Sequence, residues 1–292
     1  MRLSQKRLYQ LRAAKQEFLL EFSNYRRLLA DTLFSRQRIA NNQEIRVAGL
    51  RRTGNHAVIG WIRAQHSKYA LHFNHPPASK NPYQNAYKHC KKDILKQGAR
   101  GDFSQQSLLI ISYEDQPLAE VSSRKFELFH DVYVGRSQTR YDLLVLRDPF
   151  NLLASQLKSN MVRLSDESVQ TTVSLWKSYA REFLDETQFL CHRKTCVNFN
   201  RWHRDVDYRR AIATRLNIEF TDAGREKVRG YGGGSSFDKT GMDGEATKMK
   251  LAQRWRTFEH ETSFWDVFKD KQLLEYAEAI FADEDLPLDH VF

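Results

Sequence analysis

The sequence predicts an α/β domain: a three-layer arrangement with a central parallel β-sheet flanked by helices, behind a helical N-terminal extension. Short runs rich in β-branched residues alternate with stretches of helical periodicity, which is typical of βαβ units. The 292 residues are 41% hydrophobic and 28% charged, the composition of a folded protein. Because no long linker or repeat divides the chain, we expect one domain over residues 43–292 and the extension over residues 1–42.

The extension, from about Leu3 to Ile39, has apolar residues at helical spacing among many Arg and Lys, and no Gly or Pro. This pattern predicts a long amphipathic helix or a helix pair. We expect its apolar side to pack on the domain or on a second copy of the chain, which would make a homodimer. For this helix, contact with a membrane surface or nucleic acid is the alternative. For the protein as a whole, no nucleic-acid partner is expected.

In the sheet region, short apolar runs predict strands and longer stretches of helical periodicity predict helices. We expect strands at Glu44–Leu50, Tyr69–Phe73, Leu108–Ser112, Asp142–Leu146 and Thr195–Phe199. We expect helices at Asn55–His66, near Tyr83–Lys96, and at Phe150–Lys158, Glu167–Leu190, Trp202–Leu216, Glu245–Glu259 and Lys271–Phe281. A glycine-rich loop from Gly230 to Gly244 precedes the last helices.

The segment from Ile45 to Ile62 has the pattern of a strand, a basic turn and a helix start. Such a turn directs backbone N–H groups and the positive end of a helix dipole at one point, which suits a phosphate or sulfate. Gly49 and Gly54 have the spacing of a Walker A loop, but Asn55 and His56 follow where Lys and Ser/Thr belong. The missing ammonium and hydroxyl argue against ordinary ATP or GTP hydrolysis.

A second segment, from Tyr141 to Ser155, is again a buried strand that leads into a helix. Arg147 stands at the carboxyl end of the strand, and Pro149 lies in the first helical turn. Ligands of open parallel sheets bind beyond the carboxyl ends of strands, so we expect Arg147 and Arg52 to face the same crevice. Ser155 falls about two turns into the helix, where its hydroxyl can meet a phosphate held by the arginine.

In combination, these two segments resemble the sulfotransferases that use 3′-phosphoadenosine-5′-phosphosulfate (PAPS) and release 3′-phosphoadenosine-5′-phosphate (PAP). The resemblance runs from about residue 44 to 260 and implies that the loop binds the 5′-phosphosulfate, that an arginine and a serine bind the 3′-phosphate, and that aromatic and Ser-Ser-Phe residues lie beside the nucleotide. The residues so implied are Arg51, Arg52, Thr53, Gly54, Asn55 and His56 in the loop, then Arg147 and Ser155, then Phe199, Ser235, Ser236 and Phe237.

Three positions depart from the family's pattern. Arg52 stands where a catalytic Lys is common, and Ala57 stands where a Trp often stacks on adenine. The late Arg-Lys-Gly triplet that helps hold the 3′-phosphate has no clear copy. Its place could be taken by one of four cations: Arg229, Lys248, Lys250 or Arg254.

The resemblance implies an enzyme that moves a sulfuryl group from PAPS to a hydroxyl or amine of a small-molecule or carbohydrate acceptor. Arg52, always protonated, would stabilise the leaving phosphate with its guanidinium donors, and no metal is required. The acceptor needs a general base. Glu114, at the end of a buried strand, is the first candidate and His75 the second, with three others open: Asp115, His56 and His72.

Two other readings remain. A P-loop kinase with a degenerate loop would need Asp148 to hold Mg²⁺. A non-catalytic protein would keep the fold and bind PAP, or act as a basic scaffold. The polar, aromatic region between residues 75 and 106 is expected to help line the acceptor site.

The overall charge and the cysteines set further limits. The chain has 46 Lys and Arg against 36 Asp and Glu, a net charge of +10, which favours an anionic ligand. Cys90, Cys191 and Cys196 lack CxxC spacing, so we expect free thiols and no zinc site. No apolar run reaches about 18 residues, and the N-terminus has no apolar signal region, so we expect a cytoplasmic protein without signal peptide or anchor.

Overall fold

The computed structural model describes residues 5–34, 38–66, 68–78, 80–228, 230 and 234–291. At its centre lies a five-stranded sheet in which every neighbouring pair is parallel, in the order β2-β3-β1-β4-β5. The strands are β1 (Ile39–Gly49), β2 (Ala70–Asn74), β3 (Gln106–Glu114), β4 (Arg136–Leu146) and β5 (Thr195–Asn198). The predicted α/β class and parallel sheet are confirmed.

The strand register brings the ends of the strands to one edge of the sheet. Gly49, the last residue of β1, pairs with Glu114 on β3 and with Val145 on β4. Leu146, the last residue of β4, pairs with Asn198 at the end of β5. The segments that follow these strands therefore start side by side, at the edge where open parallel sheets bind ligands.

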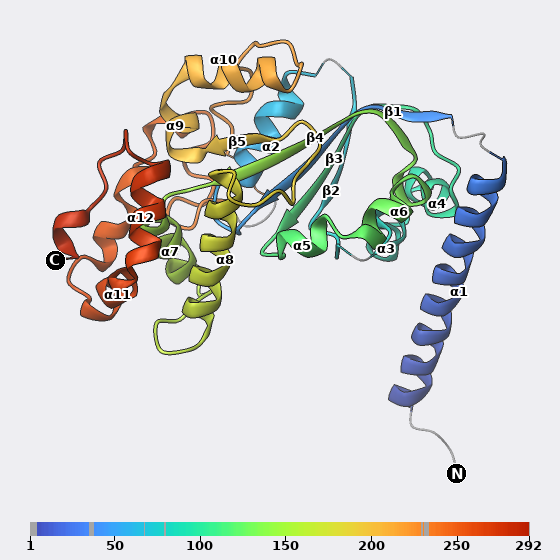
Figure 1. Ribbon diagram of the computed structural model, residues 1–292, viewed down its shortest axis with the longest axis horizontal. Helices are drawn as coiled ribbons and strands as arrows, with labels where there is room; N and C mark the ends of the chain where they lie inside the picture. The colour runs from blue at the N-terminus through green and yellow to red at the C-terminus, as the bar shows by residue number, and fades with distance from the viewer. Residues whose placement is uncertain are drawn as a thin grey trace.

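Helices cover both faces of the sheet, as Figure 1 shows. Alternate residues of β1 and β4, such as Ile45 and Val145, pack against α2 (Asn55–Ala64), α9 (Phe199–Arg204) and α10 (Val206–Arg215). The intervening residues, such as Ala48 and Leu144, pack on the opposite face. The helices on that face are α5 (Leu118–Val121), α6 (Arg124–Val134), α7 (Pro149–Lys158), α8 (Ser168–Phe183) and α12 (Lys271–Ile280), with α3 (Pro82–His89) and α4 (Asp93–Arg100) beside β2.

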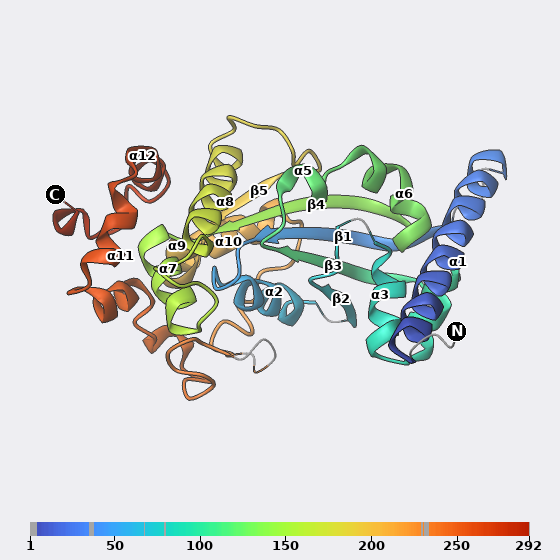
Figure 2. The ribbon, with the colours of Figure 1, turned by 90° about the horizontal axis from the view of Figure 1, so that it is seen from below.

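The C-terminal quarter consists of short turns of helix packed on α7 and α8. These are η1 (Ala246–Lys248), η2 (Leu251–Phe258), α11 (Thr262–Asp266), η3 (Val267–Lys269) and η4 (Leu288–His290). Phe150 of α7 stacks on Phe268 with ring centroids 4.2 Å apart. This region and α1 (Gln5–Phe34) lie at opposite ends of the molecule (Figure 2).

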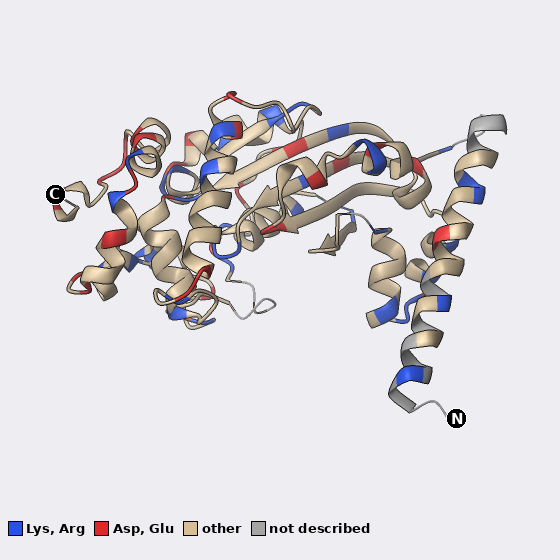
Figure 3. Cartoon of the chain, turned by 60° about the horizontal axis from the view of Figure 1, so that its bottom comes forward, with Lys and Arg blue, Asp and Glu red and all other residues tan. Residues whose placement is uncertain are grey.

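The described contacts of helix α1 with the domain come from its second half. The Tyr25 ring meets Phe129 of α6 edge-on at 4.9 Å, and Asn24 exchanges two hydrogen bonds with Gln84 of α3. The N-terminal end of the helix stands clear of the rest of the chain (Figures 1 and 3). Apolar side chains remain exposed along it, with Phe18 at 67%. The predicted long helix is confirmed, whereas the predicted homodimer stays a prediction.

Buried charges occupy the other half of the sheet, away from the ends of the strands. Arg46 on β1 is 2% exposed and forms a two-pronged ion pair with Asp142 on β4. His130 of α6 bonds to both carboxylate oxygens of Glu44, at 2.9 and 2.8 Å. Each charge here has an opposite partner, as buried charges require.

Several predicted boundaries were wrong. β1 begins at Ile39 and not at Glu44, because pairing on both sides extends the strand through polar residues that lack β propensity. The helix predicted near 83–96 is split into α3 and α4, the helix over 202–216 into α9 and α10, and that over 245–259 is 3₁₀. α8 ends at Phe183, seven residues before its predicted end at Leu190. The sequence reading missed α5 and α6.

Candidate active site

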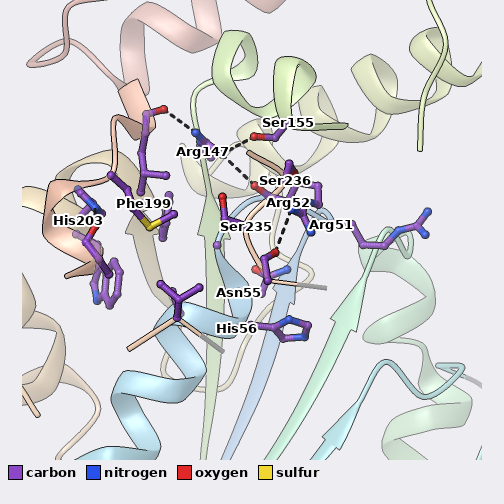
Figure 4. A pocket seen from close by; sticks show the side chains of 18 of the residues that line it. Arg51, Arg52, Asn55, His56, Arg147, Ser155, Phe199, His203, Ser235 and Ser236 are labelled. Carbon is purple, nitrogen blue, oxygen red and sulfur yellow. Dashed lines mark hydrogen bonds between the residues drawn. The ribbon is translucent and has the colours of Figure 1, made fainter. Parts of the chain in front are cut away.

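A cavity of about 300 Å³ lies at the carboxyl edge of the sheet. The loop after β1 forms one wall, and residues from the ends of β2, β3, β4 and β5 complete it (Figure 4). Twelve of the predicted site residues line it: Arg51, Arg52, Gly54, Asn55, His56, His75, Glu114, Arg147, Ser155, Phe199, Ser235 and Ser236. Thr53 and Phe237 do not: Thr53 is wholly buried, and Phe237 packs under the Arg254 guanidinium, 4.3 Å from its ring centroid.

The loop between β1 and α2 is a tight turn that opens directly into the helix. Arg52 and Gly54 both have left-handed backbone conformations, with φ of 72° and 107°. The Thr53 amide closes the turn on the Leu50 carbonyl at 3.2 Å. Asn55, His56 and Ala57, the first residues of α2, line the cavity, so the positive end of the helix dipole lies at its wall. The turn is therefore built to receive an anion.

Arg147 is a buried cation that has no acidic hydrogen-bond partner among the described residues. It is 4% exposed and donates to Ser155 Oγ at 3.1 Å, to the Arg52 carbonyl at 3.3 Å and to the Leu251 carbonyl at 2.6 Å. Burial lowers the pKa of Arg147 to about 10. The neighbouring Asp148 carboxylate is hydrogen-bonded to Asn151 and Asn200, where it caps α7. Figure 4 shows Arg147 and Ser155 joined by this hydrogen bond, and their predicted contact with a phosphate stays a prediction.

Two more arginines stand near Arg147 and repel it. Burial lowers the pKa of Arg52, although the Glu114 charge opposes this, and one Arg52 Nη donates to the Gly234 carbonyl at 3.1 Å. Burial also lowers the pKa of Arg254, which bonds to Asp238 at 2.6 Å and to Ser235 Oγ at 3.1 Å. Among the described residues, Asp238 is the one acid hydrogen-bonded to these three guanidinium groups, and the charges of Glu114 and Asp148 lie near two of them. This grouping of cations favours an anionic ligand.

Arg254 is the one of the four late cations that lines the cavity within the described residues. Lys248 pairs with Glu245 at the surface, at 2.8 Å. Arg229 lies outside the described residues, as do Gly232 and Gly233 of the glycine-rich loop.

Glu114 and His75 stand next to each other, but their hydrogen bonds give them different roles. The Asn55 amide donates to Glu114 Oε1 at 3.0 Å, and no described residue donates to Oε2. The Glu114 backbone N–H donates to Nδ1 of His75 at 3.2 Å. A neutral imidazole that accepts at Nδ1 carries its proton on Nε2. His75 is therefore set up as a donor, and Glu114 retains an oxygen able to accept a proton.

The remaining base candidates are occupied or distant. Asp115 bonds to the backbone N–H of Arg51 at 2.7 Å and also to its guanidinium, and Arg51 points away from Arg147 (Figure 4). His56 lines the cavity and bonds to Asn74 at 3.0 Å. His72 lies within the sheet against Ser112, outside the cavity, and burial lowers its pKa to about 3.

The region between residues 75 and 106 lies mostly outside this cavity. Of its described residues, only His75 lines the cavity. Tyr83 is buried against the Phe73 ring, with centroids 4.7 Å apart, and Tyr87 lies under the Lys91 ammonium at 4.4 Å. These aromatics pack α3 and α4 against the domain and do not line this cavity, and the expectation that the region helps line the acceptor site stays a prediction.

The sequence reading missed the wall formed by α9 and the segment before Gly230. Trp202, His203, Arg225 and Lys227 line the cavity there. Trp202 and His203 come soon after a predicted strand, as other site residues do. This position in the sequence was the signal that could have identified them. Arg225 and Lys227 lie in an irregular segment whose position no local pattern specifies.

No family model and no curated protein matches the sequence. Among solved structures, a sulfotransferase domain from the Synechococcus PCC 7002 olefin synthase aligns with 86% of this chain and 98% of its own, at 14% identity and a TM-score of 0.50. A sulfotransferase domain from the curacin biosynthetic pathway aligns with 83% of this chain and 98% of its own, at 11% identity and a TM-score of 0.45.

At this level of identity the likeness concerns architecture. The chain has the fold of a sulfotransferase domain, and the resemblance noted in the sequence is confirmed at the level of the fold. Separately, none of the helices in the described part of the chain is long and apolar enough to cross a membrane.

Proposed function

We propose that the protein is a PAPS-dependent sulfotransferase that acts on a hydroxyl or amine of a small-molecule or carbohydrate acceptor. The observation that carries the proposal is Arg147, a buried guanidinium whose hydrogen-bond acceptors are all neutral. A cation taken out of water without a bonded counter-charge is costly, so its retention points to an anion in the working state. Ser155 beside it supplies a hydroxyl for the same anion.

The residues present fit PAPS at three points. The turn after β1 and the N-terminus of α2 suit the 5′-phosphosulfate. Arg147 and Ser155 suit the 3′-phosphate, and Phe199 offers an aromatic face beside them, with the Arg147 guanidinium 5.9 Å from its ring centroid. Buried polar atoms of Asn55 and Ser236 have no hydrogen-bond partner among the described residues, which is typical of a binding site seen without its ligand.

The chemistry follows from the positions of Arg52 and Glu114. PAPS supplies the sulfuryl group, and the chain positions the donor and the acceptor in line. Arg52 stabilises the negative charge that develops on the departing phosphate. Glu114 Oε2 accepts the proton of the acceptor hydroxyl or amine, and the Nε2 proton of His75 is available to hydrogen-bond the acceptor.

The hydrogen bonds of Asp148 argue against a kinase that would use this residue to bind Mg²⁺. Its carboxylate accepts from the Asn151 backbone at 2.8 Å and from the Asn200 amide at 2.7 Å, and it is fully buried. A magnesium ligand would have to give up this helix cap, which contributes about 1 kcal/mol. We therefore prefer the sulfotransferase reading to the kinase reading.

The test is calorimetric titration of the purified protein with PAP, without added metal. We expect micromolar binding to the wild type and a loss of about 100-fold or more in Arg147→Ala, because the 3′-phosphate loses a charged fork. Arg201→Ala is the matched control: it removes an exposed cation paired with Asp205 outside the cavity and should leave binding unchanged. ATP, which has no 3′-phosphate, should bind weakly.

A folded protein that binds no PAP would overturn the proposal. Binding that needs Mg²⁺ and prefers ATP would favour the kinase reading. PAP binding without any turnover of labelled PAPS over a broad panel of hydroxyl and amine acceptors would favour the non-catalytic reading.

A further inference from the structure

One wall of the cavity carries polar groups that the proposed transfer does not use. Trp202 and His203 come from α9, and Arg225 comes from the segment that packs against them. In Figure 4, His203 and Phe199 lie on the side of the cavity opposite Arg51. His203 therefore lies away from Arg51, although Phe199 of the same wall contacts Gly54 of the turn assigned to the phosphosulfate.

The hydrogen bonds of His203 define its tautomer. Its Nε2 lies 3.1 Å from the Ala246 carbonyl, which can only accept, so Nε2 carries the proton. Burial lowers the pKa of His203 to about 4, with the Arg225 charge adding to the effect, so the ring is neutral near pH 7. Nδ1 is then a lone-pair acceptor, and no described residue donates to it.

The neighbours of His203 hold it in place. Trp202 stacks on Phe199 with an interplanar angle of 17° and centroids 5.5 Å apart. The Arg225 guanidinium lies 5.2 Å from the Trp202 ring centroid and donates to the His203 carbonyl. The Phe199 and His203 ring centroids are 6.4 Å apart. The Phe199 ring, which is 4% exposed, and an oriented acceptor thus stand side by side on one wall of the cavity.

We propose that His203 recognises the base of the nucleotide, an inference that rests on the proposed function. Its Nδ1 accepts a hydrogen bond from the 6-amino group of adenine. A 6-oxopurine would present an oxygen at that position instead. Two acceptors would then face each other, and both would lose their hydrogen bonds to water without replacement. His203 is in this sense a specificity-determining residue for a 6-aminopurine nucleotide.

The test compares PAP with inosine 3′,5′-bisphosphate by calorimetry on the full chain. The two ligands share ribose and phosphates and differ at the 6-position edge of the base. We expect the wild type to bind PAP about tenfold or more tightly, the range of a buried unpaired polar group. In His203→Phe, which keeps a ring against Phe199 but has no acceptor, the ratio should fall to within about threefold. His203→Asn, which restores an acceptor near the δ position, should recover part of the preference.

The outcomes separate this inference from the proposed function. Arg147→Ala should weaken both bisphosphates by a similar factor, because both carry the 3′-phosphate. Equal, tight binding of both ligands to the wild type would overturn the role of His203 and leave the proposed function intact. An unchanged ratio in His203→Phe would overturn it as well. Failure of the wild type to bind either ligand would overturn both.

Discussion

Gly54 faces Phe199 so closely that no side chain fits between them. A Cβ on Gly54 would lie 2.1 Å from Cε2 of Phe199. Gly54 precedes α2, and Phe199 begins α9 after β5, so this contact joins the anion-binding turn to the aromatic wall. The two halves of the proposed nucleotide site are thereby set against each other.

Replacing Gly54 with alanine should damage both stability and binding. The new Cβ would meet the Phe199 ring, and the φ of 107° is strained for any residue with a side chain. We expect the free energy of unfolding to fall by about 2 to 4 kcal/mol and PAP affinity to fall at least about tenfold. Urea unfolding and calorimetry measure the two effects.

Gly244→Ala is the matched control for this change. Gly244 has a φ of 88°, but a Cβ there meets nothing within 4 Å. The free energy of unfolding of Gly244→Ala should fall by about 1 kcal/mol from backbone strain alone, and its PAP affinity should not change. Equal losses in the two variants would mean that the contact with Phe199 has no energetic importance.

Arg147→Met should abolish PAP binding without destabilising the fold. The buried guanidinium has only neutral hydrogen-bond partners among the described residues, and its removal loses the attraction of Asp148 but relieves the cost of burial and the repulsion from Arg254 and Arg52. We expect the free energy of unfolding to stay within about 1 kcal/mol of wild type or to rise. Equilibrium unfolding in urea checks this.

The comparison variant is Arg46→Met, which removes an equally buried arginine. Arg46 pairs with Asp142 at 2.7 and 2.9 Å and with Glu127 at 2.8 Å. Its removal leaves the buried Asp142 carboxylate without a counter-charge, whereas Glu127 keeps its ion pair with Arg140, and the change should cost about 3 to 5 kcal/mol. A loss of similar size in Arg147→Met would show that Arg147 serves the fold and not a ligand.

Glu114→Gln should lower the rate of sulfuryl transfer about 100-fold or more and change PAP affinity little, because a general base acts on the acceptor. The amide keeps the shape of the side chain and its contact with Asn55. His75→Gln should have a smaller effect, since His75 already accepts a backbone N–H at Nδ1. Release of PAP from PAPS with a hydroxyl acceptor measures both. A larger loss in His75→Gln would reverse the assignment.

The buried pair of His130 and Glu44 predicts a loss of stability at alkaline pH. Burial alone would lower the pKa of His130, but the Glu44 charge and hydrogen bonds to Asp131 and Glu44 outweigh it and raise it to about 9. A group whose pKa is raised on folding stabilises the folded state. This stabilisation is complete below about pH 6.5 and is lost as the pH rises through about 9. Between about pH 6.5 and 9, the free energy of unfolding of the wild type should fall by about 1 to 3 kcal/mol more than that of His130→Gln. Parallel pH profiles of the free energy of unfolding would contradict this.

The homodimer predicted through α1 is tested on the full chain by light scattering. Phe18 is exposed and stacks on Phe22 with centroids 6.5 Å apart, so both rings are available to a second copy. If the dimer forms there, Phe18→Glu should halve the mass per particle. Val206→Glu, at an exposed apolar position on α10, is the control and should leave the mass unchanged. A monomeric wild type would rule the dimer out.

Local sequence patterns predicted the parts of the site that depend on neighbouring residues. The turn from Gly49 to Asn55 and the spacing of Arg147 and Ser155 are short-range features, and both have the predicted form. The missed helix α6 has the same kind of signal, with Ser123 capping it at 3.2 Å. The missed residues Arg225 and Lys227 had no such signal.

By itself, the sequence determined the α/β class, the parallel sheet and the edge of the sheet that carries the candidate site, because period, turn chemistry and strand-end position are local properties. Only the tertiary structure decided which side chains share the cavity. The register that pairs Gly49 with Glu114, and the packing of α9 against the turn, depend on contacts between segments far apart in the chain. The same long-range packing buried the aromatics of α3 in the domain and placed His203 at the cavity.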